Sequence, residues 1–70
     1  MNKQKIHGYI CRDKIGHLMF FTGRPKRNIE YECWVVDQNR IYCYDVPRAL
    51  FPKITWEDEP READMEIKLV

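Results

Sequence analysis

The sequence contains no serine, so a catalytic nucleophile would have to come from one of its three cysteines. Catalysis of this kind needs a positioned base and a group of donors that binds the developing negative charge. A hairpin could bring Cys11 close to His7 or His17, but no glycine-rich loop and no helix start lies nearby to act as the donor group. We therefore predict that the protein is not an enzyme and has no small-molecule substrate.

Long apolar runs are also missing. No stretch approaches the roughly 20 apolar residues of a membrane span, and the polar, basic run after Met1 has no apolar segment behind it. The cysteines are odd in number and not clustered, so they do not form a closed disulfide framework. These absences predict a protein without a secretion signal or membrane contact, located in the cytoplasm with free thiols.

Metal-binding residue types are present, but their spacing is unsuitable. A structural zinc site usually contains two ligands separated by about two to four residues in a tight turn. His7 and Cys11 are the nearest approach to such a pair, and on a strand they would lie roughly 13 Å apart. We predict no metal and no cofactor.

Acidic residues near the C-terminus are expected to keep a loop soluble: Glu57, Asp58, Glu59, Glu62 and Asp64.

The length of 70 residues allows one domain, which would bury only about 60% of the surface of its unfolded chain. Turn-forming residues recur about every eight to twelve residues, and no segment has a sustained helical period. The sequence therefore predicts a single β domain over residues 1–70, with residues 1–4 a candidate for disorder. The predicted strands are 5–12, 17–22, 30–37, 41–45, 53–56 and 64–69.

The predicted turns are of two kinds. Residues 13–16 and 37–40 have the composition of reverse turns, so each should join the strands on either side of it. One short 3₁₀ or helical turn is predicted near residues 47–51, because Asp45 can cap it, Pro47 suits its first turn and Pro52 prevents its continuation.

The second predicted strand is apolar on both faces, with Leu18 and Phe20 on one and Met19 and Phe21 on the other. A flat monomeric sheet would leave one of these faces wet. The fold class is therefore predicted as all-β: a small antiparallel meander forming an SH3-like, partly open barrel or a strongly bent sheet. Barrel closure would bury the second face internally, whereas an open sheet would leave it for a partner.

Aromatic side chains predict the first functional hypothesis. Aromatic residues are enriched in the cores of protein interfaces, so an aromatic face would bind an unknown protein or a second copy of the chain in a homodimer. The candidate residues for this face are Tyr9, Phe21, Trp34, Tyr42 and Tyr44.

Uneven charge predicts the alternative hypothesis. Residues 1–28 hold seven cations against one acid, a net of +6, and the remaining residues hold five against ten, a net of −5. Basic hairpin loops would present cations to phosphate groups, which is typical of nucleic-acid binding. The candidate residues for that role are Arg12, Lys14, Arg24, Lys26 and Arg27. The charge asymmetry is also explained by strands that neutralise each other once they pair.

Several short segments resemble a known group of proteins. They are the Arg-Asp-Lys-x-Gly hairpin within Cys11–Leu18, the Arg24-Pro25 loop, the Phe-Pro-x-x-Thr-Trp-Glu-Asp-x-Pro segment within residues 51–60, and the ending Met65–Ile67. Together they resemble small uncharacterised β-rich proteins of gut bacteria and of their phages and mobile elements. The resemblance covers most of the chain and implies a small β fold and a mobile-element setting. It implies no functional residues, because the shared positions are turn and core residues, and the group has no assigned activity.

Overall fold

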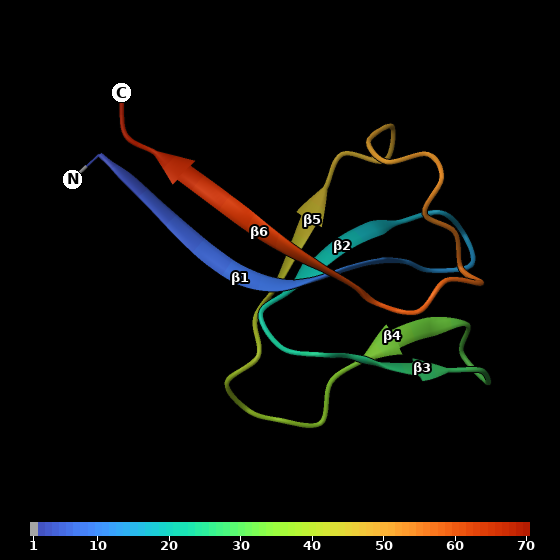
Figure 1. The fold of residues 1–70 in the computed structure, drawn as a ribbon. Coiled ribbons are helices and arrows are strands. Elements are labelled where there is room, and N and C mark those ends of the chain that lie inside the picture. The colour runs from blue at the N-terminus through green and yellow to red at the C-terminus, as the bar shows by residue number, and fades with distance from the viewer. Residues whose placement is uncertain (1) are drawn as a thin grey trace.

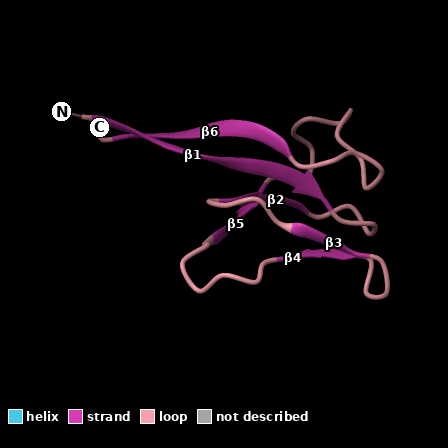
Figure 2. Cartoon of the chain, turned by 60° about the horizontal axis from the view of Figure 1, so that its bottom comes forward, coloured by secondary structure: helices cyan, strands magenta, loops and turns pink. Residues whose placement is uncertain are grey.

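The computed structural model describes residues 2–70 and contains six strands. These are β1 (Lys3–Arg12), β2 (Leu18–Phe21), β3 (Lys26–Asn28), β4 (Cys33–Val35), β5 (Cys43–Val46) and β6 (Arg61–Lys68) (Figure 1). A four-stranded antiparallel sheet has the order β5-β2-β1-β6, and β3 and β4 form a separate antiparallel pair (Figure 2). The prediction of a small all-β antiparallel domain is confirmed, and the described residues contain no helix. The sheets are not closed into a barrel.

The hairpin between β1 and β2 follows directly from its turn residues. The side chain of Asp13 accepts a hydrogen bond from the His17 amide at 2.9 Å, and the Gly16 amide donates to the Asp13 carbonyl at 3.1 Å. Gly16 has a φ of 103°, a left-handed conformation that glycine adopts at little cost. This turn sets the register in which Arg12 faces Leu18 and Tyr9 faces Phe21.

The predicted hairpin around residues 37–40 is wrong. The strand β4 instead pairs with β3, which lies in a segment predicted to be a loop, and β5 pairs with β2. A tight local turn explains the pairing of β3 with β4: the side chain of Asn28 accepts a hydrogen bond from the Tyr31 amide at 3.0 Å, and Glu32 takes a φ of 57°. The short polar strand β3 therefore pairs with β4 in place of β5.

The segment between β5 and β6 also differs from the prediction. Residues 47–54 form two successive reverse turns, closed by hydrogen bonds from Leu50 to Pro47 at 3.0 Å and from Ile54 to Phe51 at 3.0 Å. Phe51 has a φ of 51°, which interrupts any helical path. A single turn with the hydrogen-bond spacing of a 3₁₀ turn therefore forms at residues 47–50, in agreement with the prediction near 47–51, and it does not continue as a helix. The strand predicted at 53–56 does not form. We call residues 47–54 the cover loop.

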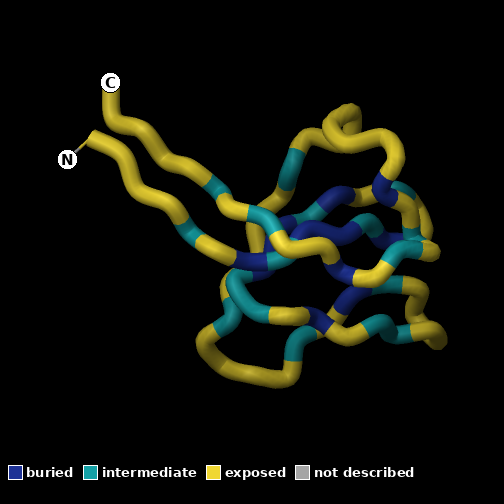
Figure 3. The backbone as a smooth tube through the Cα atoms, in the orientation of Figure 1, coloured by how far each residue is buried: buried dark blue, intermediate teal, exposed yellow. Residues whose placement is uncertain are grey.

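The chain covers both faces of its main sheet by itself. On one face, here called the loop face, Ile10 and Leu18 pack with Ile54 of the cover loop. On the opposite face, here called the hairpin face, Cys11 and Phe21 pack with Trp34 of the β3–β4 hairpin. The apolar character of both sides of β2 is thus explained by two thin cores, which Figure 3 shows as the dark, buried stretches at the centre of the molecule.

One part of the sheet projects beyond these cores. The strands β1 and β6 stay paired without a bulge from Lys3 opposite Lys68 to Ile10 opposite Arg61, and their outer halves extend away from the body (Figures 1 and 3). We call residues 3–7 and 64–68 the arm. It includes Lys3 and Gln4, which fall within the 1–4 segment considered for disorder. At its base, Gly8 leaves room for the ring of Phe20 and the carbonyl of Phe21, both of which a Cβ atom would overlap.

Candidate binding surface

The predicted aromatic face does not exist as one surface. Phe21 and Trp34 are only 2% and 6% exposed, because the β3–β4 hairpin packs against the sheet at these positions. Neither side chain is therefore on the surface of the single chain, where a partner could contact it. Tyr42 and Tyr44 are exposed, and Tyr44 lies opposite Phe20 on the loop face. Tyr9, by contrast, belongs to the hairpin face.

Trp34 belongs to a cation–π arrangement that holds the small hairpin in place. The guanidinium of Arg27 lies against both indoles of an edge-to-face pair, 4.8 Å from the ring centre of Trp34 and 5.1 Å from that of Trp56. The same guanidinium donates to the carbonyls of Trp56 at 3.1 Å and Asp58 at 2.9 Å, and the Trp34 indole donates to the Arg12 carbonyl at 2.9 Å. Arg27 therefore has a structural role that accounts for its position next to two aromatic rings.

The side chain of Arg12 has a second structural role. Its guanidinium donates five hydrogen bonds to backbone carbonyls, which is as many as it has N–H groups. Four of these carbonyls belong to the cover loop, and the fifth belongs to the β1–β2 turn. The acceptors are Ile54 at 2.7 Å, Gly16 at 2.8 Å, Leu50 at 2.9 Å, Arg48 at 3.1 Å and Phe51 at 3.2 Å. Arg12 thus attaches the cover loop to the main sheet.

The other three predicted phosphate ligands have internal partners as well. The Nζ atom of Lys14 lies 2.6 Å from the Glu32 carboxylate, and that of Lys26 lies 2.7 Å from the Asp37 carboxylate. These contacts raise the pKa of each lysine, and hydrogen bonding to Lys26 lowers the pKa of Asp37.

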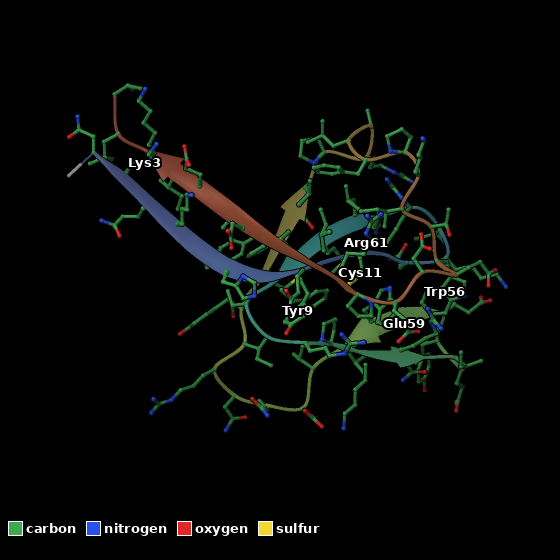
Figure 4. All side chains as sticks on the ribbon, in the orientation of Figure 1. Lys3, Tyr9, Cys11, Trp56, Glu59 and Arg61 are labelled. Carbon is green, nitrogen blue, oxygen red and sulfur yellow. The ribbon has the colours of Figure 1, made fainter. Side chains whose placement is uncertain are left out.

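Arg24 shares a carboxylate with Arg27. The Glu59 side chain accepts from Arg24 at 3.4 Å and lies 3.3 Å from Arg27, and Arg24 also lies over the ring of Tyr9 at 5.8 Å. Figure 4 shows Glu59 and Trp56 next to the β3–β4 hairpin. One acid of the loop predicted to maintain solubility is therefore a partner of two predicted phosphate ligands. The five cations are distributed among structural contacts and do not form one free basic surface.

The nucleophile and metal-ligand candidates are dispersed. Cys11 is buried, and this burial raises the pKa of its thiol to about 12, so the thiol stays protonated at neutral pH. His7 contacts Asp64 at 2.9 Å, and His17 lies 3.6 Å from Asp13. Residues 2–70 contain no group of three or more His, Cys, Asp or Glu side chains placed to hold a metal ion.

The loop face also contains a groove that the sequence did not predict. It has a volume of about 540 Å³ and lies between the cover loop and β6. Its apolar lining comes from the main sheet and from both sides of the gap, whereas Lys53, Arg61, Glu62 and Asp64 contribute charged groups. The apolar side chains that line it are Ile10, Phe20, Val46, Phe51, Pro52, Ile54, Ala63 and Met65.

The apolar lining continues along the arm. Because facing residues in an antiparallel pair share a face, Met65 and its partner Ile6 lie on the same side of the arm as the groove. Ile67 and Leu69 continue this alternation and are 49% and 68% exposed. We call Ile6, Met65, Ile67 and Leu69 the apolar strip. In Figure 4, Arg61 marks the end of β6 that lies in the body, and Lys3 lies near the outer end of the arm.

The opposite side of the arm is charged. It carries the His7–Asp64 contact and the Lys3–Glu66 ion pair, whose nitrogen and oxygen atoms are 3.9 Å apart. The arm is thus amphipathic, and its apolar side extends the groove into a longer surface.

This combined surface is mainly apolar, and its charged groups come from four residues at the groove: Lys53, Arg61, Glu62 and Asp64. Within residues 2–70 no helix has the length and apolarity needed to cross a bilayer. Comparisons of the chain with protein-family models, with curated proteins and with solved structures find no match.

Proposed function

We propose that the protein is a non-catalytic binding module that binds another protein chain through the groove and the apolar strip. The observation that carries the proposal is the continuity of this surface: the apolar lining of the groove runs directly into the exposed side of the arm. Contiguous exposed apolar surface is typical of interaction sites, because burying it removes unfavourable contact with water.

The exposure of particular side chains supports this choice of surface. Phe51 is 55% exposed at the wall of the groove, where its positive φ is compatible with the reverse turns but places a large ring in water. Ile67 and Leu69 are similarly exposed on the arm. Burying three such side chains in a complex would contribute several kcal/mol, at about 25 cal/mol for each Å² of apolar surface removed from water.

We also propose that the protein is located in the cytoplasm. The three cysteines are free, and one of them, Cys43, is exposed on β5. A reducing compartment suits an exposed thiol, since an oxidising compartment would promote intermolecular disulfides. The protonated state of the buried Cys11 further supports a role in packing for that thiol.

Site-specific photo-crosslinking tests the proposal. A benzophenone amino acid is placed at Phe51 or at Ile67 in the full chain, and cells that express it are irradiated. The matched control carries the same group at Tyr31, which is 74% exposed in the β3–β4 turn, away from the groove. We expect adducts with protein at positions 51 and 67 that exceed those at position 31. Equal labelling at all three positions, or no labelling, would contradict the proposal.

A further inference from the structure

We infer that the chain bound at this surface is a second copy of the same protein, joined by antiparallel pairing of β6 with β6. This inference depends on the proposed function, because it names the bound protein chain and places it at the edge of β6 that borders the apolar strip. It is carried by three features of β6: a free edge, a self-complementary sequence and an apolar side that continues into the groove.

The free edge follows from the strand order. Within residues 2–70 the strand β6 pairs with β1 on one side only, so in this part of the chain no strand lies next to its other side. The Leu69 amide donates to the Asn2 carbonyl, which shows that odd-numbered residues direct their backbone groups toward β1. The even-numbered residues of β6, from Glu62 to Lys68, therefore direct their N–H and C=O groups outward.

The two edges of the main sheet differ in their protection. The edge strand β5 is only four residues long and ends next to Pro47. Short strands and prolines are common ways to prevent edge-to-edge pairing. The edge strand β6 also has a proline beside it, Pro60, but it is twice as long, with eight residues, and it pairs without a bulge. It is thus the edge at which a further strand fits.

The register of the pairing is set by the sequence of β6. The apolar residues of β6 have odd numbers. For the apolar sides of both copies to lie on one face of the sheet, each odd-numbered residue must face an odd-numbered residue of the second copy. The two-fold axis must then pass beside a residue and not between two residues. An axis beside Glu66 places Met65 opposite Ile67 of the second copy and Ala63 opposite Leu69 of the second copy. The symmetry repeats each of these two contacts once, so four apolar cross-strand pairs form between the copies.

Charges also favour this axis. It places Asp64 opposite Lys68 of the second copy, which gives two attractive pairs, and only one like-charge pair, between the two Glu66 side chains. The Lys3 ammonium near each Glu66 reduces that repulsion. An axis beside Met65 would instead place Asp64 opposite Glu66 of the second copy, which gives two repulsive pairs. It would also place Arg61 opposite the apolar Leu69 of the second copy.

This arrangement also places an apolar side chain at the edge of the groove. Ala63 lines the groove, so Leu69 of the second copy, which faces Ala63, would lie at the margin of the groove. The two bodies lie at opposite ends of the paired arms, because the strands run antiparallel and each arm projects beyond its own body (Figure 1). The product is one eight-stranded sheet.

Sedimentation equilibrium over a concentration series tests the inference. We expect a mass that rises from 8.5 kDa toward twice that value. In the variant Glu66→Pro, the outward amide is lost while every bond to β1 is kept, and we expect the dissociation constant to rise by about tenfold or more. The matched control Glu66→Ala loses the same charge but keeps the amide, and we expect its dissociation constant to be unchanged or lower. Circular dichroism establishes that both variants remain folded.

The register has a separate test. In a chain with Cys43→Ala, the variant Glu66→Cys should form a disulfide-linked dimer on mild oxidation, since hydrogen-bonded facing residues have Cα atoms about 5.5 Å apart. The control Met65→Cys should remain largely unlinked. Linking at position 65 and not at position 66 would overturn the register.

The two proposals fail in different ways. A strict monomer whose groove positions still crosslink to a different protein would overturn the second-copy inference and leave the proposed function in place. A monomer without crosslinks would overturn both. A dimer unaffected by Glu66→Pro would show that β6 is not the pairing edge and would also overturn the inference.

Discussion

Replacement of Arg12 by lysine is expected to release the cover loop and so to destabilise the whole domain. Lysine keeps the positive charge and most of the aliphatic stem, but its compact ammonium has three donors and cannot reach the five carbonyls that the planar guanidinium contacts. The mutation therefore isolates the effect of geometry from that of charge.

The magnitude can be estimated from these contacts. A hydrogen bond from a charged donor contributes about 1.5–3 kcal/mol, but contacts of one side chain are not additive, and part of the guanidinium is solvated. A loss equivalent to one or two of the five bonds gives a decrease of about 2–4 kcal/mol in the free energy of unfolding. A domain of 70 residues has a total stability of only about 4–10 kcal/mol, so the variant should lie close to the unfolding threshold.

Urea denaturation followed by circular dichroism measures the effect, and hydrogen exchange locates it. The amides of Leu50 and Ile54, which close the two turns of the cover loop, should exchange faster than those of the β3–β4 hairpin. The control is Arg40→Lys, because Arg40 is an exposed residue in the turn after β4. A loss of stability below about 0.5 kcal/mol for Arg12→Lys, or equal losses for both variants, would refute the reasoning.

Three further predictions concern other parts of the molecule. Gly8→Val should reduce stability by more than Gly23→Ala, as measured by thermal unfolding, because a side chain at position 8 meets the backbone of Phe21 and at position 23 meets only a flexible Ile41 side chain. The free energy of unfolding should fall as pH rises from about 9 toward 12. The unfolded chain loses the Cys11 proton in this range, whereas the folded chain, in which the pKa of this thiol is raised, retains it. The variant Cys11→Ala should show a smaller fall. Titration with single-stranded and duplex oligonucleotides should detect no salt-dependent binding, because the predicted phosphate ligands already have internal partners; a steep salt dependence would contradict this.

The first hairpin and the all-β class were predictable because their determinants are local. Asp13 and Gly16 define a turn within four residues, and the alternation around Phe20 and Phe21 requires only a period of two. Such features depend on backbone conformation and side-chain direction, both of which sequence reasoning captures well.

The partners of β4 and β5 were not predictable because pairing is a competition between distant segments. Residues 26–28 are polar and short, and only the packing of Trp34 against Cys11 and Phe21 explains why this strand forms. The roles of Arg12 and Arg27 were missed for the same reason: a cation in a loop looks available until its carbonyl acceptors, up to 42 residues away, are located. The groove in turn depends on the positive φ of Phe51. Glycine usually indicates such a conformation in a sequence, and this position is not glycine.

The pair formed by Trp34 and Trp56 has an experimental consequence. These are the only two tryptophans of the chain, their ring centres are 5.5 Å apart, and one belongs to the small hairpin while the other follows the cover loop. Their shared fluorescence, with the Arg27 guanidinium packed against both rings, depends on both segments staying docked. Undocking of the small hairpin would change this emission without an added dye, so the protein carries a built-in optical reporter of its own opening.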